Sequence, residues 1–158
     1  PRSIELEITE TGLMKDLQGV VPSLHKLNQM GTEISIDDFG TGYSSLAYLT
    51  TLPISEVKID RSFVRDLGDT PQSSAVVSAI IALARALGLR VIAEGVEKVS
   101  QMEVLFNLGC HICQGFLFAR PMPPAQVEQW LADTQSGLIL PRVGTPPDGQ
   151  ELPPHTAL

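Results

Sequence analysis

Short extended segments alternate with longer helical segments along the chain. In residues 4–9, Ile4, Leu6 and Ile8 fall on one face of an extended segment, and the alternate positions are polar. This pattern, or a short apolar run between turn residues, predicts five strands, at residues 4–9, 33–37, 56–60, 90–95 and 111–118. Helical spacing predicts helices between and after them, at residues 11–30, 44–52, 73–88, 100–109 and 124–133.

Strands that alternate with helices in this way predict an α/β fold with a parallel sheet and right-handed crossovers. The pattern stops near Asp133, and the remainder holds five of the twelve prolines with little periodicity. We therefore expect one structural unit over residues 1–134 and a flexible, proline-rich tail over residues 135–158.

Composition narrows the possible functions of this 158-residue chain. With 43% hydrophobic and 18% charged residues it can bury a core, and its formal net charge is −7. No basic cluster stands out, which argues against binding a nucleic-acid polymer. No apolar segment is long enough to cross a membrane. We expect a cytoplasmic domain, either free or as the cytoplasmic part of a membrane-anchored protein.

Cys110 and Cys113 form a C-x-x-C motif. If both residues lie on the strand predicted at 111–118, their side chains point to opposite faces, and the thiols can share neither a disulfide nor a metal. His111 would share a face with Cys113, but two ligands do not make a zinc site. The sequence therefore predicts two packing residues rather than a redox or zinc motif.

Polar side chains gather where the predicted strands end. They are Glu7, then Asp37 and Asp38, then Lys58 and Asp60, then Glu94 and Glu97, and finally Gln114. A single acid at such a place is often only a helix cap or a turn residue. In a parallel sheet, however, all these strand ends open on one rim, where ligands bind. Five consecutive strands that each deliver such a group favour a functional site.

The chemistry of these groups suits hard cations. Mg²⁺ and Mn²⁺ prefer carboxylate oxygens and water. Asp37, pointing inward by strand parity, could bridge two metals, and Asp38 could reach the second. Two such ions can hold the attacking and leaving oxygens of a phosphodiester, and Lys58 could orient water or stabilise charge on the phosphate.

The segments ELEITE, IDDFGTGYSSL, VKID, VIAEGVE and QGFLFARPM resemble, in order and spacing, the EAL domain family of cyclic di-GMP phosphodiesterases. The resemblance covers about residues 2–133. It implies a modified TIM barrel of which this chain holds the last five or so βα units. It also implies hydrolysis of cyclic di-GMP to linear pGpG with Mg²⁺ or Mn²⁺.

The resemblance also implies a role for each matching residue. Glu7 is similar to a ligand of the first metal, Asp37 to the bridging ligand, Asp38 to a ligand of the second, and Lys58 to the lysine that binds the catalytic water. Glu94 resembles a general base or second-metal ligand, and Gln114 an amide that positions water. Glu10 resembles the anchor of the loop that contains Gly40, Thr41 and Gly42, and Asp60, Glu97 and Pro121 match positions assigned to substrate contact or rim structure.

One departure from the family pattern is large. The Glu-Ala-Leu tripeptide and a following Asn, which would supply two ligands of the first metal, belong upstream of residue 4, and five strands cannot close an eight-stranded barrel. We therefore expect a C-terminal segment that is inactive alone, from a protein with an upstream sensor or cyclase domain that forms a homodimer. Two alternatives stay open: a non-catalytic cyclic di-GMP receptor or interaction module, and another Mg²⁺-dependent barrel such as an enolase-like lyase.

Overall fold

The strands form one parallel sheet. The computed structural model describes residues 4–42 and 46–135. The strand order β1-β2-β3-β4-β5 follows the chain, so each connection crosses over from one end of the sheet to the other. The strands are β1 (Glu5–Thr9), β2 (Glu33–Phe39), β3 (Glu56–Ile59), β4 (Arg90–Ala93) and β5 (Ile112–Cys113). The predicted parallel α/β architecture is confirmed.

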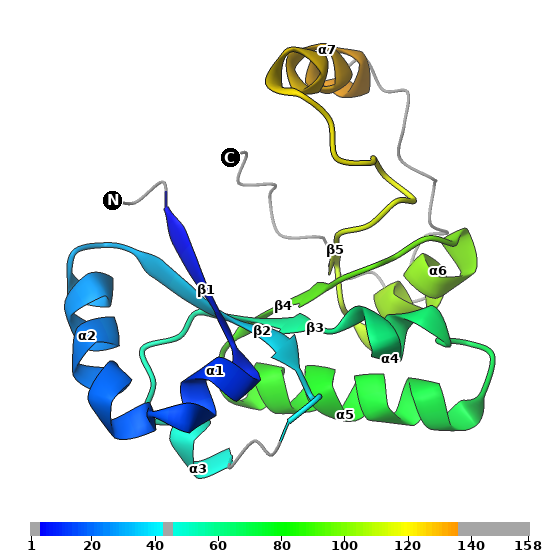
Figure 1. Ribbon diagram of the computed structural model, residues 1–158. Helices are drawn as coiled ribbons and strands as arrows, with labels where there is room; N and C mark the ends of the chain where they lie inside the picture. The colour runs from blue at the N-terminus through cyan, green and yellow to red at the C-terminus, as the bar shows by residue number, and fades with distance from the viewer. Residues whose placement is uncertain (1–3, 43–45, 136–158) are drawn as a thin grey trace.

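Helices cover one face of the sheet. Figure 1 shows α2, α5 and α6 lying along that face, whereas α7 stands apart from the sheet. The buried core fills the space between them, with Ile34, Ile36, Val57 and Ile59 contributed by the two central strands. The helices are α1 (Glu10–Lys15), α2 (Leu17–Gln29), α3 (Leu46–Leu49), α4 (Arg61–Arg65), α5 (Pro71–Ala86), α6 (Val99–Leu108) and α7 (Pro124–Gln135).

The other face of the sheet carries charge. The register pairs Glu7 with Ser35, Ser35 with Glu56, and Glu56 with Arg90, which places these side chains on the same face. The next residue along this face of β3 is Lys58. Ser35, Glu56 and Lys58 are nevertheless buried. Charged groups therefore occupy the face that points away from the helices.

The prediction of a single helix over residues 11–30 is wrong, because two helices, α1 and α2, meet at Asp16. Asp16 has non-helical backbone angles, and its carboxylate accepts a hydrogen bond from the backbone N–H of Gly19 at 3.1 Å. This is an N-terminal helix cap, which ends one helix and begins the next. A second cap begins α4, which the sequence reading missed: the carboxylate of Asp60 accepts from the backbone N–H of Ser62 at 3.0 Å.

The fifth strand is much shorter than the expected 111–118. It ends at Cys113, and the chain then turns, with the N–H of Phe118 bonded to the carbonyl of Gly115. Gly115 lies against the backbone of Val96, where a side-chain carbon would fall 2.2 Å from the Val96 carbonyl oxygen. The path of the chain after Cys113 is therefore set by packing of Gly115 against the segment that contains Val96, rather than by strand pairing.

The expected separation of the two cysteines is also wrong. Cys110 precedes β5, so strand parity does not apply to it, and its Sγ lies 3.3 Å from the carbonyl oxygen of Ile112. A hydrogen bond from the neighbouring thiol of Cys113 lowers the pKa of Cys110 and raises that of Cys113. Both thiols are free. The two thiols therefore lie close enough to share a hydrogen bond, and they form no disulfide.

The boundary expected at residue 134 falls one residue before the end of α7. The proline-rich segment over 135–158, including its Leu-Ile-Leu-Pro stretch, lies outside the described residues apart from Gln135. None of the helices in the described ranges is long and apolar enough to cross a membrane.

Candidate active site

The rim at the carboxyl ends of the strands brings together side chains from three strands. Lys58, on β3, places its ammonium between two carboxylates, with Nζ 2.8 Å from Glu7 on β1 and 2.6 Å from Glu94 after β4. Lys58 is 5% exposed. Burial by itself lowers the pKa of a lysine, but the hydrogen bonds to both carboxylates outweigh it and raise the pKa of Lys58 above its usual value. Lys58 therefore stays charged and holds the two acids together.

Asp37 and Asp38 occupy an irregular place near the end of β2. The register between β2 and β3 shifts between Ile36 and Phe39, and Asp38 has a positive φ of 54°. Such bulges are common beside active sites, where they redirect side chains. Asp37 Oδ1 accepts a hydrogen bond from the backbone N–H of Asp38 at 2.9 Å, which fixes the first carboxylate against the second residue.

Acidic groups crowd at this point. Burial raises the pKa of Asp38, and the negative charges of Asp37 and Asp60, together with a hydrogen bond to Asp60, raise it further. Burial works in the same direction on Asp60, but the hydrogen bonds from Ser62 outweigh it and lower the pKa of that carboxyl. The crowding leaves negative charge that an additional cation would stabilise.

Glu10 connects the start of α1 with the loop after β2. It is 1% exposed, and its Oε2 accepts a hydrogen bond from the backbone N–H of Gly40 at 2.8 Å. Gly42 also lies close, because a side-chain carbon there would fall 2.7 Å from Glu10 Oε1. Thr41 bonds back to the Asp38 carbonyl through its hydroxyl at 2.8 Å. Glu10 therefore contacts the loop at Gly40, and its role as an anchor of that loop stays a prediction; residues 43–45 of the loop lie outside the described residues.

The other expected site residues lie farther round the rim. Gln114 follows β5 directly, where its backbone bonds to Ala93 and Val96 and its side chain is exposed. Glu97 and Asp60 line one cavity between α4 and the loop before α6. Pro121 is exposed in the segment between β5 and α7. The structure thus joins Glu7, Lys58 and Glu94 directly.

The donor chemistry of the rim fits a divalent cation. All four expected ligands (Glu7, Asp37, Asp38 and Glu94) are carboxylates, the ligands that Mg²⁺ and Mn²⁺ prefer. Lys58 already holds positive charge between two of them. Within residues 4–42 and 46–135, however, no three acidic, histidine or cysteine side chains converge closely enough to hold a metal. The described residues therefore supply the right ligand type but do not complete a metal centre.

A family model for the EAL domain matches residues 1–121. The chain belongs to the EAL domain family. It is 52% identical over 127 residues to the bifunctional diguanylate cyclase/cyclic di-GMP phosphodiesterase MucR of Pseudomonas aeruginosa, covering 80% of this chain and 18% of MucR. It is also 47% identical over 137 residues to the cyclic di-GMP phosphodiesterase RocR of the same species, covering 87% of this chain and 34% of RocR.

Solved EAL structures share the fold. The MucR phosphodiesterase in complex with cyclic di-GMP superposes with a TM-score of 0.77 at 52% identity, covering 80% of this chain and 51% of that one. The EAL domain of Mycobacterium smegmatis DcpA gives a TM-score of 0.77 at 44% identity, covering 83% and 59%. A manganese and cyclic di-GMP complex of Klebsiella pneumoniae BlrP1 gives 0.72 at 36% identity, covering 77% and 31%. The sheet is therefore part of an EAL-type, TIM-like barrel, and the chain spans about half the length of the first two structures.

Proposed function

We propose that this chain is the C-terminal part of an EAL phosphodiesterase domain that hydrolyses cyclic di-GMP to linear pGpG with Mg²⁺ or Mn²⁺. The observation that carries the proposal is the Glu7–Lys58–Glu94 contact at the rim, beside the paired acids Asp37 and Asp38. Two further findings support the proposal. Several relatives are named cyclic di-GMP phosphodiesterases, and solved EAL structures hold cyclic di-GMP together with manganese or calcium.

Each residue has a role in this reaction. Glu7, Asp37, Asp38 and Glu94 would hold the divalent cations, which supply electrophilic activation of the phosphate and acidification of water. Water adds to phosphorus as the bond to the 3′ oxygen breaks, and that leaving oxygen takes up a proton to become the 3′ hydroxyl of pGpG. Lys58 donates hydrogen bonds at the rim and holds Glu94. If Glu94 is the general base rather than a second-metal ligand, it would accept the proton of the attacking water. The amide of Gln114 orients that water.

Other residues would act on the substrate rather than on the reacting bond. Glu10 holds the Gly40–Gly42 loop at the edge of the acid pair. Asp60 and Glu97 face a common cavity beside the rim, and with Pro121 they would contact the parts of the dinucleotide outside the cleaved phosphate. Carboxylates at such positions can accept hydrogen bonds from the N–H groups of a base.

The proposal includes the rest of the protein. Within the described residues β1 and β5 each pair on one side only, and an eight-stranded barrel needs further strands to close. We place those strands, with two more ligands of the first metal, upstream of residue 4. An upstream sensor or cyclase domain, a homodimer of the whole protein and a cytoplasmic location belong to the same proposal.

The direct test is hydrolysis by the full natural chain. Purified protein is incubated with cyclic di-GMP and Mg²⁺ or Mn²⁺, and the products are separated by chromatography and identified by mass spectrometry. We expect pGpG, and we expect a chelator to abolish its formation until the cation is restored. Intact dinucleotide after prolonged incubation with either metal would contradict the proposed reaction.

A non-catalytic cyclic di-GMP receptor is the second candidate. One observation favours it: within the described residues, no three acidic, histidine or cysteine side chains converge closely enough to hold a metal. Calorimetric binding of cyclic di-GMP without turnover, and without dependence on a divalent cation, would support the receptor over the enzyme. The enolase-like lyase is set aside, because the chain belongs to the EAL family.

A further inference from the structure

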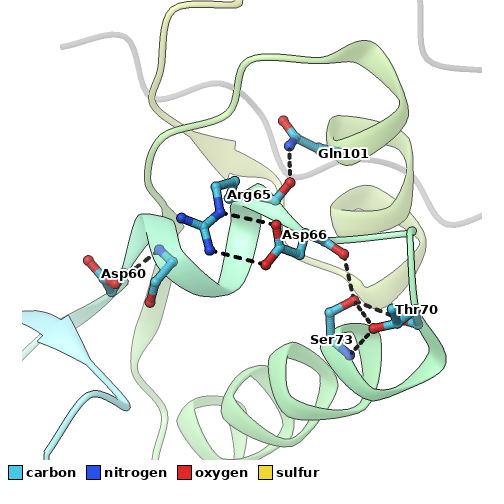
Figure 2. Close-up of polar contacts among 7 residues, drawn as sticks. Asp60, Arg65, Asp66, Thr70, Ser73 and Gln101 are labelled. Atoms are coloured by element: carbon cyan, nitrogen blue, oxygen red, sulfur yellow. Dashed lines mark hydrogen bonds and ion pairs between the residues drawn. The ribbon is translucent and has the colours of Figure 1, made fainter.

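Gln101 connects two segments that each carry residues of the candidate site. It lies in the first turn of α6 and is 3% exposed. Its Oε1 accepts hydrogen bonds from the backbone N–H groups of Glu97 and Lys98, both at 2.9 Å. Its Nε2 donates to the backbone carbonyl of Arg65, at the end of α4, at 3.0 Å, as Figure 2 shows. One side chain thus ties the loop before α6 to α4.

These two segments form the walls of a cavity of about 540 Å³. Its lining includes Asp60 and Glu97, the two acids assigned above to substrate contact, and Gln101 itself. The walls approach closely at Gly95, which has a φ of 69° and where a side-chain carbon would fall 2.5 Å from Cβ of Arg61. The separation of α4 and the loop therefore sets the width of this cavity.

The loop is held at separate points along its length. Glu94, at its start, is fixed by a backbone bond to Ile59 and by the contact of its carboxylate with Lys58. Val96 bonds through its N–H to Gln114 and through its carbonyl to Leu117. Gln101 holds the far end, at Glu97 and Lys98. A change at Gln101 should therefore displace Glu97 and leave Glu94 in place.

We propose that Gln101 is a positioning residue that sets the place of Glu97 relative to α4 and thereby controls how tightly the site binds its dinucleotide. The inference rests on the proposed function and deepens it, since it assigns substrate binding to a buried amide that does not touch the reacting atoms. The donor half of the amide is essential to this role, because only that half reaches α4.

The alternative is that Gln101 only caps α6. Glu and Gln serve equally well at the third position of a helix, since either can accept a hydrogen bond from the N–H groups at its start. A glutamate at position 101 would keep that acceptor but could not donate to the Arg65 carbonyl when ionised. The substitution Gln101→Glu therefore separates the two roles, whereas Gln101→Met removes both hydrogen-bonding halves at nearly constant volume.

The experiment compares these two variants with the wild type in the full natural chain. Gln129→Glu is the matched control, because Gln129 is exposed on α7, away from the loop before α6, and its side chain donates within that helix to Asp133 at 3.0 Å. Steady-state hydrolysis of cyclic di-GMP gives kcat and KM separately. Calorimetry gives the affinity for cyclic di-GMP, and circular dichroism gives the melting temperature.

We expect Gln101→Met to raise KM and Kd about tenfold, with kcat changed by no more than about twofold, because binding is lost without loss of transition-state contacts. We expect Gln101→Glu to raise KM roughly fivefold while restoring most of the melting temperature, since the acceptor survives. Gln129→Glu should match the wild type in kcat, KM and Kd, with only a small fall in melting temperature from the like charge of Asp133. If Gln101→Met does not fold, Gln101→Glu decides the question by itself.

A wild-type KM and Kd in Gln101→Glu would overturn the inference and leave a simple cap. A fall in kcat with unchanged KM would also overturn it, because Gln101 would then act on the reacting groups. A wild type that binds but does not hydrolyse would contradict the proposed reaction alone, and the Kd values would still test Gln101. A wild type that neither binds nor hydrolyses would overturn the proposed function and this inference with it.

Discussion

Glu56 should make the stability of this fold depend on pH between about 4.5 and 7. It is 2% exposed at the start of β3, and its Oε2 lies 3.1 Å from Nε of Arg90, while its Oε1 has no hydrogen-bond donor among the described residues. Burial, followed by the negative charge of Glu5 and a hydrogen bond with Glu5, raises the pKa of Glu56 from 4.5 to about 7. Arg90 and Lys58 lower it, but by less.

The sign follows from proton binding. Between pH 4.5 and 7 the folded state keeps a proton on Glu56 that the unfolded chain releases, so the free energy of unfolding falls as pH rises through this range. A displacement of the pKa from 4.5 to about 7 corresponds to a loss of about 3 kcal/mol when complete. Below pH 4.5 both states hold the proton, and above pH 7 neither holds it, so the dependence on Glu56 disappears there.

The variant Glu56→Gln tests this reasoning, because an amide resembles the protonated acid and does not ionise. We expect denaturant unfolding, followed by circular dichroism at pH 5, 6, 7 and 8, to show the wild type losing stability and Glu56→Gln losing about 2.5 kcal/mol less over that range. The matched control is Glu33→Gln, since Glu33 also pairs with Arg90 but its side chain is 50% exposed. Its effect should stay within about 1 kcal/mol. Parallel pH profiles for the wild type and Glu56→Gln would refute the argument.

Three further predictions concern activity. Asp37→Asn should lower the rate of cyclic di-GMP hydrolysis about a hundredfold or more without changing the circular dichroism spectrum, because an amide cannot carry the charge of a bridging carboxylate. Near-normal turnover would contradict the two-metal assignment. Glu10→Ala should lower kcat about tenfold, while the Mg²⁺ titration of activity keeps its midpoint. Glu10→Gln should be less affected, because it keeps an acceptor for the N–H of Gly40. Wild-type turnover in Glu10→Ala would exclude an anchoring role. The 158-residue chain alone should associate in sedimentation and release little pGpG, because within the described residues β1 and β5 each pair on one side only and leave an open sheet edge. A chain extended upstream should be monodisperse or dimeric and active. A short chain that sediments as a monomer and turns over normally would show that no upstream strands are needed.

Much of the fold could be predicted from strand and helix periodicity, because burial follows it closely. In β1, Leu6 and Ile8 are half-buried and Glu5, Glu7 and Thr9 are exposed, as the alternation indicates. The errors arose where a single side chain or a close contact decides the path. In the sequence, Asp16 cannot be distinguished from a polar residue on the exposed face of a helix. Only the structure shows that its carboxylate caps α2. The cap at Asp60 was visible in the sequence as an acid before a helical segment, and α4 could have been found from it.

The site could be predicted only in part for the same reason. Strand ends identified the acids of the rim, but the contacts among them depend on distances that no pattern contains. Nothing in the sequence shows that Lys58 lies between Glu7 and Glu94, since the three residues come from β1, β3 and the loop after β4. No sequence pattern singles out Gln101, because it lies in a helix whose pattern indicates only packing against the core. Its hydrogen-bond partners are backbone groups, which leave no signal in the sequence.

The charged face of the sheet also restricts how the strands can align while the chain folds. The pairing of β3 with β4 sets Glu56 beside Arg90 and Lys58 beside Ile92. A slip by one residue would turn Glu56 and Lys58 toward the helices, into the space now filled by Val57 and Ile59. Such an alignment would bury two charges away from their partners, which is costly. The charged residues of this face thus discriminate against misaligned sheets, and a variant with an apolar face in their place would lose that discrimination even if it gained stability.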